Sequence, residues 1–240
     1  MQEQQSRLPE LRNVLLNNTK LRVLDIRTQS NFSRGMRGPG DHTKFRSMNL
    51  PLQPSDRFPP LHELRFSGSA TYEFELSHAK LWSQCMDWSQ LRTLDLGISC
   101  PQHFFEEIGS QLIGLRSLTM GIGTGPRNYV VWKFGPMTCD TLQPASQFIA
   151  SLSGLQELHI TDLDAAAEKI VPTIVQTQTS LQVLSYHTSM HRRLEPKMLP
   201  CTWTTAQLDE LQQRAPNISG LSIDLPLEDG KWVSIVGRVI

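Results

Sequence analysis

The chain has 240 residues, of which 39% are hydrophobic and 19% charged, and its 23 basic residues are balanced by 23 acidic ones. This composition is typical of a folded domain rather than a disordered segment. The charge balance gives no global reason to expect nucleic acid or an anionic membrane as a partner. No apolar run approaches the roughly 20 residues of a membrane span, and the polar start of the chain lacks the apolar core of a signal peptide. The sequence therefore favours an intracellular protein, cytoplasmic or nuclear, with reduced cysteines.

A six-residue pattern, L-x-x-L-x-L, recurs along the chain. Its copies begin at residues 21, 61, 91, 115, 155, 181 and 218, and LRTLDL at Leu91 is the clearest. In each copy the last two leucines alternate with one polar residue, so they share one face of a short strand. The shortest intervals between copies fall in the roughly 20–29-residue range of a leucine-rich repeat. Since one copy is too small to bury its own apolar edge, the copies are expected to stack as a parallel sheet.

Helices are predicted before most of these strands. Apolar residues at helical spacing indicate helices within residues 7–18, 101–112, 147–152, 164–178 and 204–217. Thr204 with Gln207 three residues later forms a capping-box pattern, and Pro172 is expected to bend or shorten its helix. At the end of the chain, Trp232, Ile235, Val236 and Val239 have the spacing of a helix face. We expect a further repeat or a cap to cover that face.

This alternation, with phrases such as FPPLHELRF, WSQLRTLDL and RAPNISGLSI, resembles the leucine-rich-repeat region of fungal F-box-type proteins from about Leu8 to Ile223. The resemblance implies one α/β solenoid over residues 1–240, with short parallel strands on its concave side, helices on its convex side and irregular repeat lengths. It also implies non-catalytic protein–protein recognition, similar to that of a substrate receptor of a ubiquitin ligase. A Skp1-type adaptor is implied only if an F-box lies upstream, because none precedes the first copy here. A structural scaffold, or a truncated fragment without independent activity, is the alternative, and an enzyme is a distant one.

The concave face is the predicted binding surface. Residues between the buried leucines point outward there, and the middle column reads Asp25, Arg65, Asp95, Thr119, His159, Ser185, Ser222. The candidate partner-binding residues are charged or histidine side chains in and beside this column: Asp25, Arg27, Glu63, Arg65, Asp95, Glu157, His159 and His187. Opposite charges on consecutive strands are expected to pair across the sheet. The predicted surface is charged toward the N-terminus and neutral-polar toward the C-terminus.

The segment 27–60 interrupts the pattern as a basic insertion. It has six basic residues against Asp41 and Asp56, and its Gly, Pro and Ser content predicts a mobile surface loop. A solvated insertion is favoured, and a docking loop for an acidic protein surface is the alternative. Nucleic-acid binding is not favoured, because the loop offers no packed aromatic platform.

Other short motifs do not complete a chemical site. MGIGTGP, from Met120, lacks the helix start and the Lys of a phosphate loop. His187 and His191 lie four residues apart, but without the Glu of an HExxH motif. SHAK, from Ser77, has neither of the companion motifs of penicillin-interacting enzymes. We therefore expect no catalytic residue, cofactor or metal.

Overall fold

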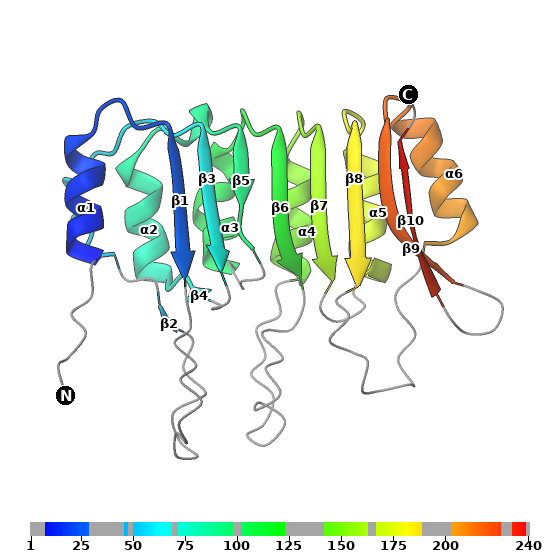
Figure 1. Ribbon diagram of the computed structural model, residues 1–240, viewed down its shortest axis with the longest axis horizontal. Helices are drawn as coiled ribbons and strands as arrows, with labels where there is room; N and C mark the ends of the chain where they lie inside the picture. Colours follow the sequence, from blue (N-terminus) through cyan, green and yellow to red (C-terminus); the bar gives the residue numbers. More distant parts are fainter. Residues whose placement is uncertain are drawn as a thin grey trace, which may run out of the picture.

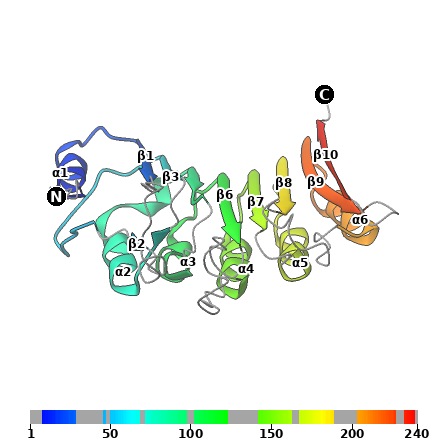
Figure 2. The same ribbon diagram turned by 60° about the horizontal axis from the view of Figure 1, so that its bottom comes forward.

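The structure is a computed structural model with an α/β architecture, in which helices cover one side of a single eight-stranded sheet (Figures 1 and 2). The residues it describes are 8–28, 46–47, 50–68, 72–97, 102–122, 142–162, 167–188, 203–226 and 232–238. Strands and helices alternate along most of the chain, as the sequence predicts.

The strands lie side by side in chain order, and the sheet is not closed. They are β1 (Val23–Thr28), β3 (Glu63–Gly68), β5 (Thr93–Asp95), β6 (Ser117–Ile122), β7 (Glu157–Asp162), β8 (Val183–Thr188), β9 (Gly220–Pro226) and β10 (Trp232–Arg238). The first seven are parallel, and β10 pairs antiparallel with β9. A separate two-stranded sheet joins β2 (Arg46–Ser47) and β4 (Tyr72–Glu73).

Each L-x-x-L-x-L copy forms one strand, which begins at the third residue of the pattern. In the five central copies, the first, fourth and sixth residues are at most 2% exposed. The first copy is less completely covered, since Leu24 is 8% exposed and Leu21 and Ile26 are only partly buried. This difference follows from stacking, because an end copy has a neighbour on one side only.

Successive copies are joined by the same backbone contacts before each strand. The carbonyl of Arg22 accepts hydrogen bonds from the N–H groups of His62 (2.7 Å) and Glu63 (3.0 Å). The equivalent carbonyl of every later copy repeats this arrangement, as far as Gln182 with Ser219 and Gly220. The second residue of the pattern is therefore a fixed structural position along one edge of the sheet.

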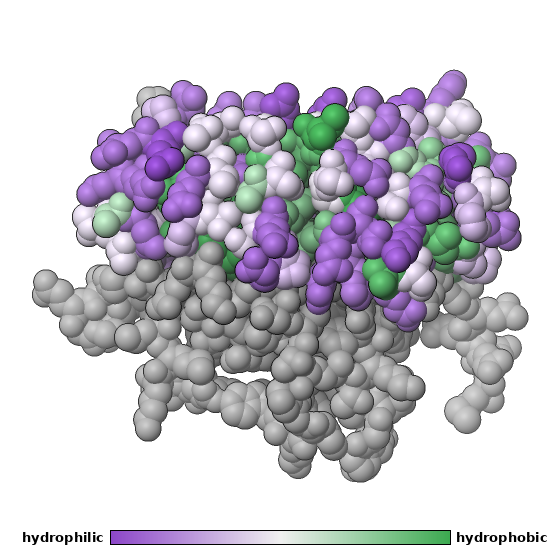
Figure 3. All heavy atoms as spheres, turned by 180° about the vertical axis from the view of Figure 1, so that it is seen from behind, coloured by the Kyte–Doolittle hydropathy of each residue, from purple (hydrophilic) through white to green (hydrophobic). Residues whose placement is uncertain are grey.

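The helices run along one side of the sheet, with α1 and α6 near its two ends (Figures 1 and 2). They are α1 (Leu8–Asn17), α2 (Leu76–Cys85), α3 (Gln102–Ile108), α4 (Leu142–Ser151), α5 (Ala167–Thr177) and α6 (Thr205–Arg214), with 3₁₀ turns η1 (Trp88–Gln90) and η2 (Gly109–Gln111). The capping box predicted at the start of α6 is confirmed, since Thr204 and Gln207 bond each other's backbone N–H groups. Pro172 does not end its helix, which continues to Thr177. The outer surface of this layer is largely hydrophilic (Figure 3).

The core between α2, α3 and the sheet is rich in aromatic rings. Phe66, Phe74, Trp82, Trp88 and Phe104 are each at most 2% exposed. The ring centroids of neighbouring members lie 5.2–6.4 Å apart, and most of these pairs are edge to face. Helix α2, which supplies Trp82 to this cluster, was not predicted from the sequence.

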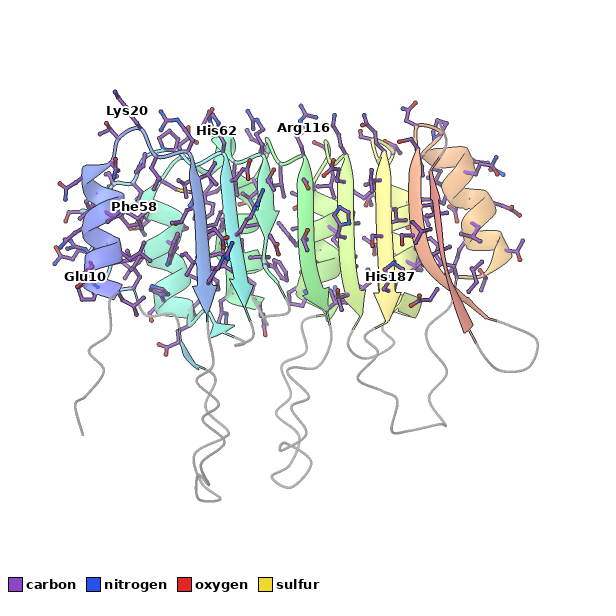
Figure 4. The ribbon with its side chains drawn as sticks, in the orientation of Figure 1. Glu10, Lys20, Phe58, His62, Arg116 and His187 are labelled. Carbon is purple, nitrogen blue, oxygen red and sulfur yellow. The ribbon has the colours of Figure 1, made fainter. Side chains whose placement is uncertain are left out.

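Part of the predicted mobile insertion is packed into the fold. Leu50, Leu52 and Phe58 are buried, and Figure 4 places Phe58 between α1 and α2. Asp56 is 4% exposed and accepts two hydrogen bonds from Arg12 of α1, at 2.6 and 2.7 Å. This pairing lowers the pKa of the Asp56 carboxyl. The prediction of a surface loop is therefore wrong at Leu50, Leu52, Asp56 and Phe58, because composition does not reveal the apolar anchors and the buried ion pair. Residues 29–45 and 48–49 of this insertion lie outside the described residues.

The C-terminal segment is the other correction. Residues 232–238 form β10 and not the predicted helix. The spacing of Trp232, Ile235 and Val236 fits a helix face, but the segment is rich in β-branched residues that favour strands. Pairing with β9 satisfies the backbone groups that would otherwise form an open edge of that strand.

Candidate interaction surface

The side of the sheet opposite the helices, here called the open face, carries the third, fifth and seventh residues of each L-x-x-L-x-L copy. Strand alternation places them there because the fourth and sixth residues point into the core. The register aligns the fifth residues in the order predicted from sequence, from Asp25, Arg65 and Asp95 to Ser185 and Ser222. All eight candidate residues therefore lie on one face, on β1, β3, β5, β7 and β8.

The charged residues at the β1 end form ion pairs along their own strands. Arg27 Nε lies 3.1 Å from Asp25 Oδ2, and Arg65 Nη2 lies 2.6 Å from Glu63 Oε2. Each pair joins residues two apart, which point to the same face of a strand. Asp95 accepts the backbone N–H of Gly97 at 2.8 Å, in a turn where Gly97 has a φ of 57°. The prediction of pairing across strands thus missed these contacts, although the side chains are neighbours as expected.

The centre of the open face is polar. The Ser117 hydroxyl donates to Glu157 Oε2 at 2.9 Å and so connects β6 to β7. His159 lies half-exposed beside Thr119 and Ser185 in the register. A hydrogen bond between a hydroxyl and a carboxylate therefore takes the place of the arginine–carboxylate ion pairs of the β1 end.

At the β9 end, His187 joins two side chains of the neighbouring strand. Its Nδ1 lies 3.0 Å from Asp224 Oδ1, and its Nε2 lies 2.7 Å from the Ser222 hydroxyl. Asp224 is 2% exposed, whereas a third of the His187 side chain is exposed. His187 and Ser222 were predicted from the sequence to lie on this face, but Asp224 was not. The one signal for Asp224 is its position two residues beyond Ser222, on the same face of β9.

The order Ser–His–Asp is that of a hydrolase triad, but Ser222 sits in a different backbone setting. It lies in the middle of β9, in register with Ser185 on one side and Val236 on the other. The backbone N–H groups around it are therefore used in sheet ladders, whereas acyl transfer needs such groups directed at the developing oxyanion. The arrangement supports a structural role, in which polar side chains join β8 to β9.

A metal site is not formed by the described residues, among which no three His, Cys, Asp or Glu side chains cluster. His191, considered with His187 for metal binding, lies outside those residues, and so do the glycines of MGIGTGP beyond Gly121. Within the part of the chain that the structure describes, no helix has the length and apolar character to cross a membrane.

No family model matches the chain, and neither a curated protein nor a solved structure is significantly similar to it.

Proposed function

We propose that the chain is a leucine-rich-repeat-like solenoid that recognises a protein partner on its open face without catalysing a reaction. The expected location inside the cell is part of this proposal, and the buried free thiol of Cys85, whose pKa burial raises to about 11, is compatible with it. The main support for the proposal is the set of ion pairs on the open face, Arg27 with Asp25 and Arg65 with Glu63.

A partner that covers β1 and β3 on this face would meet charges that are already neutralised. Removing a lone charge from water costs several kcal/mol, by order of magnitude, unless an opposite charge accompanies it. Arg27 and Arg65 each keep a carboxylate within 3.1 Å. These two strands can therefore be covered without leaving either arginine unpaired, while their exposed side chains still provide hydrogen bonds for specificity.

The opposite end of the face is held in a fixed geometry. Both ring nitrogens of His187 have partners on β9, so its imidazole presents one orientation to a ligand. Groups ordered before binding lose less conformational entropy when a complex forms. The open face thus combines neutralised charges with preordered polar groups.

The resemblance described above suggests the class of assembly. A substrate-receptor role in a ubiquitin ligase would use the open face for the substrate, and a Skp1-type adaptor would require an F-box upstream of this chain. A structural scaffold is the second reading of the same face, in which the side chains only satisfy one another. The setting of Ser222 supports a non-catalytic role over an enzyme.

The test is quantitative affinity capture from cell extract with the 240-residue chain as bait, followed by binding measurements with the protein captured. Arg65→Glu combined with His159→Glu changes both the β1 end and the centre of the face. Leaving a buried charge unpaired costs about 2–5 kcal/mol, so we expect the affinity to fall at least about thirty-fold.

The matched control is Arg214→Glu on α6. Arg214 is 49% exposed and ion-paired with Glu210, much as Arg65 is 48% exposed and paired with Glu63. A partner lost with the open-face variant and kept with the control supports recognition there. Equal binding by both variants, with unchanged circular dichroism, would refute it, and capture of chaperones alone would favour a fragment without independent function.

A further inference from the structure

A row of basic side chains follows the edge of the sheet where the parallel strands begin. The second residues of the first four L-x-x-L-x-L copies are Arg22, His62, Arg92 and Arg116, and Lys20 precedes the first copy. Figure 4 shows Lys20, His62 and Arg116 along this single edge. The next three copies have Gln156, Gln182 and Ser219, so the row is confined to β1, β3, β5 and β6. We call Lys20, Arg22, His62, Arg92 and Arg116 the basic edge.

The arginines of the basic edge are held by backbone carbonyls. Arg22 Nη1 donates to Thr19 O at 3.0 Å and Leu21 O at 2.9 Å. Arg92 Nη1 donates to Ser89 O at 2.9 Å and reaches Gly114 O of the next copy at 3.0 Å. Arg116 Nη1 likewise donates to Gly154 O at 3.2 Å. These contacts use one nitrogen of each guanidinium and fix its position.

The positive charge of this row is not neutralised by a carboxylate. Arg12, Arg27, Arg65 and Arg214 all have ion-pair partners. In contrast, Lys20, Arg22, Arg92 and Arg116 form no ion pair with any described residue. Asp87 lies in a turn of the same edge, but its carboxylate accepts the Ser89 N–H and hydroxyl at 3.1 and 2.6 Å. A chain without net charge thus concentrates unpaired cations along one edge.

An exposed aliphatic side chain accompanies these cations. Ile113 is 77% exposed and lies in the turn before β6, next to Gly114, whose carbonyl accepts from Arg92 Nη1. Figure 3 shows a hydrophobic spot at the upper margin of the helix-covered side. A large exposed apolar residue among fixed cations is suited to a ligand that has both carboxylates and an aliphatic group.

We propose that the basic edge binds an extended acidic segment of a partner protein, independently of the open face. Neighbouring strands lie about 4.8 Å apart, so the row from β1 to β6 spans on the order of 15 Å, which about five residues of extended chain match. Carboxylates at alternate positions of such a segment face the guanidinium groups, and one aliphatic residue packs on Ile113. Single-stranded nucleic acid fits less well, because it is bound by exposed aromatic platforms and every aromatic side chain of described burial is buried here.

The proposal is tested with a fluorescein-labelled peptide in which glutamates alternate with alanine and one leucine, and with the same peptide carrying glutamine for glutamate. Fluorescence anisotropy is measured with the full chain at about 50 mM and about 300 mM salt, since screening weakens exposed charge pairs. We expect binding of the acidic peptide only, and weaker binding at the higher salt concentration.

The variant pair is Arg92→Gln with Arg116→Gln, which removes charge but keeps an amide donor for the backbone carbonyls. The control is Arg27→Gln with Arg65→Gln, two arginines of the open face. We expect the first pair to weaken acidic-peptide binding roughly ten-fold, at about 0.5–1 kcal/mol for each exposed charge pair, and the control to leave it unchanged. Ile113→Ser should remove only the increase in affinity that the leucine of the peptide provides.

Three results would overturn the proposal: no binding of the acidic peptide, equal weakening by both variant pairs, or tighter binding of a single-stranded oligonucleotide that the edge variants abolish. Because the open face is probed by Arg65→Glu with His159→Glu, failure of one proposal is distinguishable from failure of the other.

Discussion

At the scale of single residues, His78 of α2 is a buried imidazole with incomplete hydrogen bonding. Trp82 Nε1 donates to His78 Nε2 at 3.2 Å, and the same nitrogen lies 3.2 Å from the carbonyl of Leu50. Nε2 cannot both accept from Trp82 and donate to Leu50, and Nδ1 has no hydrogen-bond partner among the described residues. Burial lowers the pKa of His78 because the charged imidazolium is poorly solvated there.

The first prediction concerns pH. Below the usual histidine pKa of about 6.5, the unfolded chain takes up a proton that the folded chain resists, so stability should decrease as the pH falls. We expect the urea midpoint to be lower at about pH 5.5 than at about pH 7.5, and His78→Gln to reduce this difference. His62→Gln, at an exposed histidine, is the control. Asp56 affects stability in a separate pH range. Because its pKa is lowered, the stability that it contributes is lost only below the pH range in which carboxyl groups usually titrate. If the urea midpoint of His78→Gln depended on pH as much as that of the unchanged protein, His78 would not be the cause of the pH dependence.

At the scale of secondary-structure elements, the turns between helix and strand are sites of close packing. A Cβ on Gly114 would lie 2.3 Å from the carbonyl oxygen of Ser89 and 1.6 Å from Arg92 Nη1. A Cβ on Gly154, at the same position of the next copy, would meet only Arg116 Nη1 at 3.1 Å. The first contact involves backbone, which cannot move aside, whereas the second involves the end of a flexible side chain.

We therefore predict that Gly114→Ala lowers the free energy of unfolding by about 1–3 kcal/mol through overpacking. Gly154→Ala should change it by less than about 0.5 kcal/mol. Urea unfolding followed by circular dichroism measures both variants. Similar losses in the two would mean that the turn before β6 is not especially constrained.

At the scale of the whole molecule, the two ends of the sheet differ in how they are secured. Toward β1, the aromatic cluster lies under β3 and β5, and α1 is tied to residues 50–60 through Arg12 and Asp56. At the other end, α6 contributes Leu211 as its one fully buried residue. In a stacked array each copy is stabilised mainly by its neighbours, so local stability follows local packing.

Hydrogen exchange should show this difference. We expect the amides of β3, β5 and β6 to exchange most slowly, and those of β9, β10 and α6 to exchange earlier, in native conditions. Mass spectrometry of peptides from each strand measures the order. Uniform protection across the sheet would indicate one cooperative unit and contradict the predicted gradient.

The sequence by itself determined the seven parallel strands of the main sheet and most of the helices. The starts of all seven parallel strands, the buried first, fourth and sixth positions and the alignment of Asp25, Arg65 and Asp95 follow from L-x-x-L-x-L, because strand alternation and repeat stacking are local and periodic. The order of the open-face column could be read for the same reason. The sequence also contained the second-position arginines, although their pattern emerges only when the copies are aligned as stacked strands.

Only the tertiary structure decided the contacts between residues that no period relates. Arg12 meets Asp56 across 44 residues, and His187 meets Asp224 across 37. It also decided that residues 50–60 are packed and that residues 232–238 form a strand, which local spacing had assigned to a loop and a helix. Burial and strand pairing depend on the surface that a segment finds in the folded chain, and they override the weaker preferences of its own sequence.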